Sequence, residues 1–319
     1  AEVYQKFVFA IQVIDEAQYI KNPSTQAAKG VKKITAAFKL ALPGTPIENR
    51  LSELWSIFDY LMPGFLYTYQ KFREEIELPI AVNQDANKME RLQRMIRPFI
   101  LRRLKGDVLK DLPEKIEENV FARLDGEQMQ LYDAYATRMK EMLSQQNEKE
   151  FHKGRMQILS ELTKLRQLCC DPGLLLEDYH GESAKTDMCM ELIVNAVGAG
   201  HKILLFSQFT SMLDRLTERL KKEGIDYYLL TGSVNKEKRM QMVESFNNDD
   251  VPVFCISLKA GVTGLNLTSA DIVIHYDPRW NVAVQNQATD RAHRNWQKNV
   301  VTVYKHVSQG TIEEKNIDI

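Results

Sequence analysis

Cysteine is scarce in this sequence, and its few cysteines lack the spacing of a metal site. Only four occur among 319 residues, with no C-x-x-C pair and no nearby histidine at ligand spacing. They are Cys169, Cys170, Cys189 and Cys255. We therefore expect a reduced intracellular protein without structural zinc.

Long hydrophobic runs and an excess of one charge are also absent. No apolar run reaches membrane-spanning length, and the first residues show no basic segment followed by a hydrophobic signal core, so we expect no membrane partner. Lys+Arg 42 nearly balance Asp+Glu 43, so any basic surface must be local. The 319 residues, 44% of them hydrophobic, are enough for two domains with substantial cores.

A third absence concerns phosphate binding. Neither Gly-Lys-Thr nor Gly-Lys-Ser occurs among the 15 glycines, so the sequence contains no phosphate loop. The stretch 198–202 (GAGHK) is superficially similar. It follows a predicted helix and precedes a predicted strand, which is the wrong order, and we exclude it.

Among the features that are present, one strand ends in two carboxylates. Residues 6–14 are β-branched and aromatic enough to predict a buried strand, and Asp15 and Glu16 follow where it leaves the sheet. In a parallel sheet, that carboxyl end is where ligands bind. Two adjacent anions repel, which favours a cation or polarised water between them. An exposed loop start before a helix is the alternative.

The last third of the sequence alternates short apolar strands with helices. Strands are expected at 203–206, 227–230, 253–256, 272–275 and 300–304. This order predicts a parallel sheet in an α/β domain at about 184–319. Ser211 and Asp214 have the spacing of a capping box at one helix start, and Asn235 is expected to cap another helix.

The first part of the chain mixes strands with helices. A helix is expected at 25–37 and a short strand at 38–42. Apolar residues at helical spacing predict helices at about 50–112 and again at 125–183. Between these two helical regions, residues 116–124 alternate like a strand.

One helix, expected to begin near Asn281, carries two arginines. Gln287, Arg291 and Arg294 lie at i, i+4 and i+7, which would place them on one face. Planar guanidinium groups match phosphate oxygens, so such a face can hold a triphosphate. A solvated helix with an ion pair between Asp290 and Arg294 fits the same pattern.

The stretch 258–266 follows a predicted strand directly and contains two glycines. Gly261 and Gly264 therefore fall in a strand-to-helix turn. Backbone amides at such a turn can closely approach a phosphate or ribose. A tight turn that needs positive φ explains the glycines equally well.

Taken together, these stretches resemble the Swi/Snf family of DNA-translocating ATPases in helicase superfamily two. Residues 15–18 (DEAQ) resemble its acidic box, and 42–55 (LPGTPIENRLSELW) its coupling loop and the following helix. Residues 98–103 (PFILRR) and 112–115 (LPEK) resemble the segment that closes its first lobe. Residues 204–209 (LLFSQF), 258–266 and 287–297 match its second lobe in the right order.

The resemblance covers nearly the whole chain and implies an α/β fold of two RecA-like parallel-sheet lobes with helical insertions. It assigns 1–49 to the C-terminal part of the first lobe, 50–112 to a helical insertion, 113–124 to the closing strand of the first lobe, 125–183 to a second helical insertion or linker, and 184–319 to the second lobe. In this family the phosphate loop lies upstream of the acidic box. The first lobe is therefore expected to be truncated and the second complete.

The resemblance also implies ATP and Mg²⁺ as cofactors. Asp15 would hold Mg²⁺ through water, and Glu16 would orient or deprotonate the attacking water. Arg291 and Arg294 would be arginine fingers that stabilise charge on the γ-phosphate. The other implied nucleotide contacts are Gln287, Asp290, Gly261 and Gly264. Residues implied in coupling or DNA contact are Gln18, Gly44, Thr45, Ser207, Gln208, Lys259, Asn266 and Trp280.

These roles imply a fragment of a DNA-dependent ATPase that couples hydrolysis to translocation on double-stranded DNA and displaces or remodels proteins bound there. Contacts mainly to phosphates would make binding salt-sensitive and little concerned with sequence. The fragment alone is expected to bind ATP weakly and to hydrolyse essentially none. Its location would be the cytoplasm, at the nucleoid, in a bacterium and the nucleus in a eukaryote.

Several positions depart from the family pattern and keep alternatives open. They are Pro43, Val262, Arg279, Asn295 and Trp296. A bulky Trp296 and Val262 at turns expected to use glycine are compatible with a non-catalytic interaction module derived from this ATPase. An RNA helicase on the same scaffold is a further alternative. Gln18 in place of Asp, and Gly-Thr-Pro at 44–46 in place of Ser-Ala-Thr, weigh against it.

Overall fold

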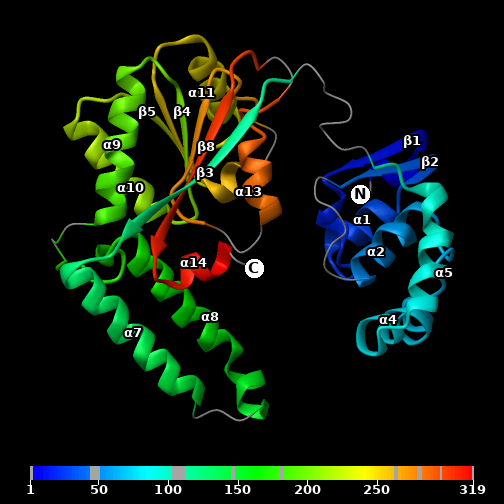
Figure 1. Ribbon diagram of the computed structural model, residues 1–319. Helices are drawn as coiled ribbons and strands as arrows, with labels where there is room; N and C mark the ends of the chain where they lie inside the picture. Colours follow the sequence, from blue (N-terminus) through cyan, green and yellow to red (C-terminus); the bar gives the residue numbers. More distant parts are fainter. Residues whose placement is uncertain are drawn as a thin grey trace. The chain divides into compact units, whose positions relative to one another are not determined.

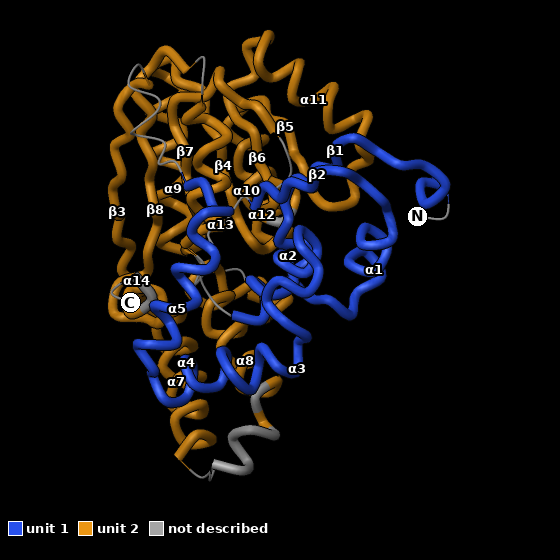
Figure 2. The backbone as a smooth tube through the Cα atoms, turned by 90° about the vertical axis from the view of Figure 1, so that its right-hand side faces the viewer, with its two compact units in different colours: residues 1–108 blue, residues 109–319 orange. Residues whose placement is uncertain are grey.

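The chain forms two compact units, residues 1–108 and 109–319, drawn in different colours in Figure 2. The computed structural model describes residues 3–43, 51–102, 112–144, 148–179, 181, 183–261, 265–278, 282–294 and 297–317. No helix within those ranges is long and apolar enough to cross a membrane.

The first unit combines a two-stranded sheet with short helices (Figure 1). Its elements are η1 (Tyr4–Lys6), β1 (Val8–Asp15), η2 (Ala17–Ile20), α1 (Gln26–Lys32), β2 (Thr35–Leu42), α2 (Leu51–Leu61), α3 (Tyr69–Phe72), η3 (Arg73–Glu77), α4 (Leu78–Asn83), α5 (Ala86–Ile96) and η4 (Arg97–Phe99). The helices from α2 onward pack around Phe58, Phe72 and Leu92, so the expected helical region beyond residue 50 has its own apolar core.

The sheet of the first unit is covered on one face only. β1 and β2 pair in parallel, from Val8 opposite Thr35 to Asp15 opposite Leu42. On the covered face, Gln12 Nε2 donates to Val31 O of α1 at 3.2 Å, and the Tyr60 hydroxyl of α2 donates to Gln12 O at 3.4 Å. Burial raises the pKa of Tyr60 to about 12.

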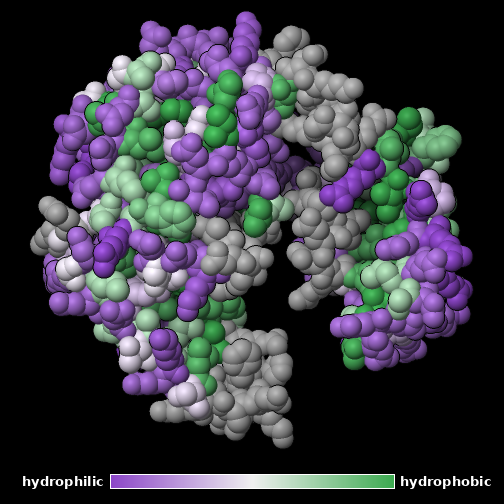
Figure 3. Space-filling view, viewed as in Figure 1, coloured by the Kyte–Doolittle hydropathy of each residue, from purple (hydrophilic) through white to green (hydrophobic). Residues whose placement is uncertain are grey.

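The opposite face of this sheet is apolar and exposed. It consists of Ile11, Val13, Phe38, Leu40 and Leu42, whose register pairs Ile11 with Phe38 and Val13 with Leu40. Their side chains are 52–71% exposed, and apolar residues are visible over β1 and β2 in Figure 3. The expectation of a buried strand at 6–14 is therefore wrong for this face. The strand forms as its sequence indicates, but no described element of the first unit covers this face.

The second unit contains one large sheet and most of the longer helices (Figure 1). Its elements are β3 (Lys115–Arg123), α7 (Gly126–Ser144), α8 (Glu148–Cys170), η5 (Pro172–Leu174), α9 (Ala184–Gly198), β4 (Ile203–Ser207), α10 (Thr210–Lys222), β5 (Tyr227–Leu230), α11 (Lys236–Asn248), β6 (Val253–Ser257), α12 (Leu258–Gly261), β7 (Ile272–His275), α13 (Val282–Thr289), β8 (Val301–Gln309) and α14 (Ile312–Ile317). All four cysteines are buried free thiols in this unit.

Six parallel strands form this sheet in the order β3-β8-β7-β4-β6-β5, and helices cover both faces. Leu205 of β4 packs with residues of α9 and α10, whereas its neighbour Leu204 packs with residues of α11, α12 and α13. Strands buried on both faces read as continuous apolar runs, which is why the sequence revealed them. The expected parallel α/β class is confirmed.

One strand joins a different sheet from the one expected. Residues 113–124 were assigned to the first lobe, but β3 pairs along its whole length with β8, from Lys115 opposite Val301 to Arg123 opposite Gln309. That assignment is wrong because β8 offers an edge nine residues long. A strand pattern predicts a strand, but it does not say which sheet edge the strand will join.

The two predicted helix caps have different outcomes. Asn235 caps α11, and its side chain accepts a hydrogen bond from Lys238 N at 2.9 Å, as predicted. The capping box at Ser211 and Asp214 is wrong, because α10 already begins at Thr210. Just before it, the Ser207 hydroxyl accepts a hydrogen bond from Phe209 N at 3.1 Å.

Candidate functional site

The two carboxylates of the first unit lie where the sequence places them, at the carboxyl end of β1. Asp15 is the last residue of the strand, and Glu16 follows with φ 51° and ψ 50°. This left-handed conformation is unusual for a residue with a side chain, and such residues cluster at functional sites. No sequence pattern indicated this conformation, which distinguishes Glu16 from an ordinary loop start.

Local hydrogen bonds orient both carboxylates. Glu16 N donates to Asp15 Oδ1 at 2.9 Å, and Gln18 Nε2 donates to Glu16 Oε2. Ala17 and Ile20, on the turn that follows, are buried and anchor it to the unit. The structure therefore brings together the three acidic-box side chains that the sequence singled out.

The carboxylates alone do not form a complete metal site. Among the described residues, no group of three or more His, Cys, Asp or Glu side chains is placed to hold a metal ion. Oxygen donors of the Asp15 kind suit Mg²⁺, which binds through one or two carboxylates and keeps water and phosphate oxygens as its other ligands. The donor set at the end of β1 fits that type of partial site.

In the second unit, several predicted site residues share one edge of the sheet. Ser207, at the end of β4, lies opposite Ser257 at the end of β6, and Phe206 lies opposite His275 at the end of β7. Because all these strands are parallel, the residues that follow them emerge at the same edge. Gln208, α12 and the stretch 276–278 therefore lie together there.

Gly261 is required for packing. It ends α12 without positive φ, so the tight-turn explanation is wrong for this glycine. A Cβ at Gly261 would lie 2.9 Å from a ring carbon of Phe206. Only glycine lets α12 approach β4 so closely.

The sequence-based reasoning missed Asp277, which lies two residues beyond β7. Its carboxylate is buried, and both of its oxygens accept from Gln208 N, at 3.1 and 3.2 Å. Burial raises the pKa of Asp277 to about 6, opposed by a hydrogen bond from Ser207 and the positive charge of Arg166. An acidic residue two positions after a buried strand was the available signal.

The arginine segment is a turn and not the expected helical face. α13 ends at Thr289, so Arg291 and Arg294 lie beyond it, and the predicted alignment with Gln287 on one helix is wrong. Instead, both guanidinium groups donate to Leu265 O, Arg291 at 3.5 Å and Arg294 at 3.2 Å. Arg291 is buried and Arg294 is exposed.

Further backbone and side-chain contacts hold this turn. Leu267 N donates to Arg291 O at 3.0 Å. His293 Nε2 lies 2.8 Å from Pro113 O, just before β3. Gln297 Nε2 donates to Ala270 O at 2.8 Å and to Ala292 O at 3.1 Å. The turn is therefore anchored to two segments distant in sequence, residues 265–270 and Pro113, which no helical periodicity could have shown.

A buried histidine supports the helix that precedes the turn. His275 Nε2 lies 2.8 Å from the hydroxyl of Thr289, and the imidazole stacks on Phe206 at a centroid distance of 5.5 Å. Burial lowers the pKa of His275 to about 3. The ring is therefore neutral near pH 7 and ties the end of β7 to the last residue of α13.

Several predicted residues cannot be placed in this arrangement. Gly44, Thr45, Gly264 and Trp280 lie outside the described residues, as do Val262, Arg279, Asn295 and Trp296. Lys259 belongs to α12, with its side chain outside the described part. Gln287 and Asp290 are half-buried, and Asn266 is exposed, with its carbonyl accepting from Asn247 Nδ2 at 2.8 Å.

Comparison with family models gives two matches. The SNF2-related domain matches residues 1–174, and the helicase conserved C-terminal domain matches residues 184–295. The first match includes Asp15, Glu16 and Gln18, and the second includes Asp277, Arg291 and Arg294.

Individual proteins show the same likeness. An uncharacterized ATP-dependent helicase of Mycoplasma pneumoniae is 41% identical over 312 residues, which is 96% of this chain and 29% of that protein. Human TATA-binding protein-associated factor 172 is 35% identical over 373 residues, covering 98% of this chain and 20% of that protein. The chain thus spans less than a third of either relative.

A solved structure also matches along the whole chain. The Sulfolobus solfataricus SWI2/SNF2 ATPase core in complex with dsDNA has a TM-score of 0.55 and 36% identity, with 100% of this chain and 67% of that chain covered. Its likeness supports the α/β assignment of both units independently of the motifs.

Proposed function

Because the chain belongs to the SNF2-related family of helicase superfamily two, we propose that it is part of a DNA-dependent ATPase that couples hydrolysis to translocation along double-stranded DNA. The observation that carries the proposal is the strained Glu16 beside Asp15 at the carboxyl end of β1. Such strain persists where the surrounding structure enforces it, most often at a functional site. Its neighbour Gln18 completes the acidic box.

The acidic pair is suited to two different tasks in ATP hydrolysis. Asp15 would hold Mg²⁺, whose charge would polarise the phosphate oxygens. Glu16 would orient or deprotonate the attacking water. The hydrogen bond from Gln18 fixes the Glu16 side chain, so that a change at Gln18 reaches the water position directly. That link would couple nucleotide state to nucleic-acid contact.

The arginine turn is suited to stabilising charge on a γ-phosphate. Arg291 and Arg294 share one anchor, Leu265 O. Each guanidinium presents five N–H donors in a planar fork that matches phosphate oxygens, and the bond to Leu265 O orients the group. Gln287, Asp290, Gly261 and Gly264 are the proposed further nucleotide contacts. The proposed coupling or DNA contacts in this unit are Ser207, Gln208, Lys259, Asn266 and Trp280; Gly44 and Thr45 have that role in the first unit.

Double-stranded DNA is the proposed partner, together with proteins bound to it. Support comes from the Sulfolobus core, which was solved with dsDNA. Contacts to phosphates would make affinity fall steeply with salt and depend little on sequence. The protein would then act where the DNA is, in the cytoplasm of a bacterium or the nucleus of a eukaryote.

The test compares ATP turnover by the 319-residue chain with turnover by the longer protein of which we propose it is a part. The longer protein should hydrolyse ATP faster when duplex DNA is added. Glu16→Gln should lower kcat by about 100-fold or more, as expected for loss of a general base. Glu90→Gln is the matched control. It removes one partner of an exposed ion pair with Arg94 on α5 and should leave kcat unchanged.

The 319-residue chain should show no turnover, because its sequence has no phosphate loop. DNA-stimulated hydrolysis by this chain that is lost on Glu16→Gln would contradict that part of the proposal. Absence of hydrolysis by the longer protein would favour a non-catalytic interaction module. Stronger stimulation by duplex RNA than by duplex DNA would favour an RNA helicase.

A further inference from the structure

The helical pair α7 and α8 forms an arm that extends from the six-stranded sheet (Figure 1), and side-chain hydrogen bonds hold the last carbonyls of α8 at its base. The last carbonyls of a helix normally lack partners within it. Here side chains from α7, β8, the start of α9 and the end of β7 supply them. Leu168 O accepts from Gln128 Nε2 at 2.8 Å, Cys169 O from Ser308 Oγ at 3.0 Å, and Cys170 O from Ser183 Oγ at 2.8 Å and the Tyr276 hydroxyl at 2.9 Å.

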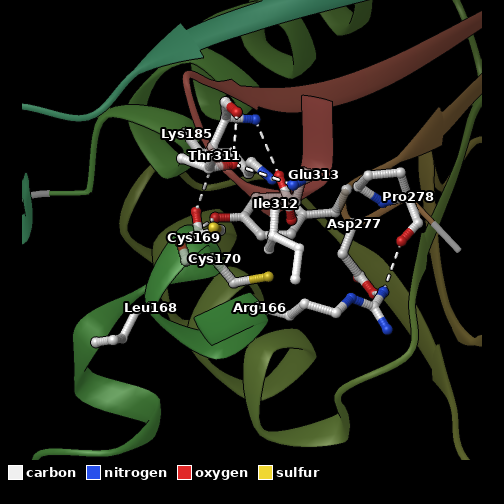
Figure 4. A network of polar contacts seen from close by, with 12 residues as sticks. Arg166, Leu168, Cys169, Cys170, Lys185, Asp277, Pro278, Thr311, Ile312 and Glu313 are labelled. Atoms are coloured by element: carbon white, nitrogen blue, oxygen red, sulfur yellow. Dashed lines mark hydrogen bonds and ion pairs between the residues drawn. The ribbon is translucent and has the colours of Figure 1, made fainter. Parts of the chain in front are cut away.

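A buried ion pair lies beside this base (Figure 4). Lys185 of α9 and Glu313 of α14 are both essentially inaccessible to solvent, and Lys185 Nζ donates to Glu313 Oε2. The same carboxylate oxygen accepts from Ser308 N at 2.9 Å. The arm therefore begins from a rigid network and not from a flexible hinge.

One side chain of the arm reaches out of this network toward the sheet edge. Arg166 lies one helical turn before Cys170, and its guanidinium donates to Pro278 O at 2.6 Å (Figure 4). It also lies 4.0 Å from Asp277 Oδ2. Only 12% of the Arg166 side chain is exposed, so this contact is screened little by solvent.

The far side of Asp277 holds the turn after β4. Both carboxylate oxygens accept from Gln208 N, and the Ser207 side chain contributes another hydrogen bond. A buried carboxylate is stable only with such partners. Arg166 and Gln208 thus depend on the same group, although they come from elements 42 positions apart in the chain.

We propose that Asp277 is a positioning residue that holds the Ser207–Gln208 turn at the sheet edge and, through Arg166, couples that turn to the arm of α7 and α8. A displacement of the arm would then change the turn, and engagement of the turn would restrain the arm. The part of the inference that gives the turn a role in DNA contact rests on the proposed function. The coupling itself does not.

The structure offers a control for a carboxylate that merely stabilises the fold. Asp171, just after α8, is also buried and also joins a backbone N–H to an arginine: its carboxylate accepts from Gly173 N at 2.7 Å and from Arg215 Nε at 3.3 Å. It ties the end of α8 to α10 and has no contact with Gln208 among those described. Loss of Asp171 should therefore match loss of Asp277 in stability but not at the turn.

Hydrogen exchange in the 319-residue chain tests the coupling without any need for ATPase activity. Asp277→Asn should speed exchange of the Gln208 amide about tenfold, the effect of losing one charge-assisted hydrogen bond. Arg166→Gln should speed it about threefold, although Arg166 does not touch Gln208. Asp171→Asn should leave it unchanged. Equal exchange in all four proteins, or equal acceleration by Asp171→Asn, would overturn the proposal.

Arg166→Gln keeps this test decisive if Asp277→Asn fails to fold, because its change lies on the arm and not at the carboxylate. An unchanged Gln208 amide in a folded Arg166→Gln protein is then enough to reject the coupling.

The functional consequence is measured in the longer protein. Asp277→Asn should raise the duplex DNA concentration needed for half-maximal ATPase stimulation by about tenfold, with the KM for ATP unchanged. Asp171→Asn should leave that concentration as in the wild type. A shift in the KM for ATP instead would contradict a role at the turn. Absence of any ATPase in the unmodified protein would reject the proposed function and leave the exchange result standing.

Discussion

The two sheets of this protein have similar strands and opposite surroundings. In the second unit, every residue of β4, β6 and β7 is buried, with helices on both faces. In the first unit, β1 and β2 have no fully buried residue, and Phe38 is 71% exposed. Both sets are apolar and parallel. An apolar strand sequence therefore predicts a strand, but its burial depends on what the rest of the chain places against it.

The exposed face of the first sheet has a specific composition. Ile11, Val13, Phe38, Leu40 and Leu42 form a contiguous apolar surface beside the acidic box. Soluble proteins rarely leave such surfaces open, and those that remain are generally contact sites. By contrast, the apolar residues of the larger sheet already contribute to stability through burial. Substitutions matched between the two units should therefore have unequal effects.

The largest difference is expected between the ion pairs of the two units. Lys185→Met would leave the Glu313 carboxylate buried without its cation and should lower the free energy of unfolding of the second unit by about 4 kcal/mol. Lys32→Met removes a pair with Asp59 whose side chains are 23% and 26% exposed, and it should cost the first unit less than about 1 kcal/mol. Hydrogen exchange of β4 and β2 peptides reports each unit separately.

A double variant tests whether the unpaired Glu313 carboxylate causes the loss of stability in Lys185→Met. Lys185→Met with Glu313→Gln removes both charges and retains an oxygen that accepts from Ser308 N. It should recover most of the lost stability. No recovery would mean that packing of the lysine stem, and not the unpaired charge, accounts for the loss.

The second difference concerns apolar side chains of the same type. Leu205→Ala in β4 removes a fully buried side chain and should destabilise the second unit by about 3 kcal/mol. Leu40→Ala in β2 changes a side chain that is 52% exposed, and it should alter the first unit by less than about 0.5 kcal/mol. Hydrogen exchange of each unit, measured over a series of denaturant concentrations, gives both changes in stability. A cost of 2 kcal/mol or more for Leu40→Ala would show that its face is covered in solution.

The third difference is acid sensitivity, because all six histidines lie in the second unit. Burial lowers the pKa of His275 and of His306 from 6.5 to about 3. Below pH 6.5 the unfolded chain binds protons that the folded chain does not, so stability falls as pH decreases, by about 1.4 kcal/mol per unit for each histidine. Asp277 has the opposite sign, because its pKa is raised to about 6 and its folded form binds a proton first.

The net loss in the second unit should be about 2 kcal/mol at pH 5 relative to pH 7. The first unit should change much less over the same interval. Exchange measured at both pH values distinguishes the units. A similar loss in both would contradict the assignment to buried histidines.

Sequence reasoning succeeded where a local pattern determines the structure. It failed where contacts with residues distant in the chain determine the backbone conformation. The ends of β5 and β7 agree with the predicted 227–230 and 272–275 because those runs are apolar and bounded by polar residues. Arg291 and Arg294 leave the predicted helix because Leu265 O holds them both, and His293 binds Pro113, which is 180 positions away. The acidic box was located, but the left-handed Glu16 was not.

The smallest expected effect separates the two buried histidines from each other. Neither ring nitrogen of His306 has a hydrogen-bond partner in the described part of the chain, and the residue is fully buried. An unpaired buried polar group costs free energy, so His306→Leu should maintain or raise stability at pH 7, by up to about 1 kcal/mol. His275→Leu should do the reverse, because it leaves the buried Thr289 hydroxyl without its partner. Thermal unfolding of both variants at pH 7 and pH 5 measures this. Destabilisation by His306→Leu would show that its imidazole has a polar partner in solution and that the interior of the larger sheet tolerates polar groups only when they are satisfied.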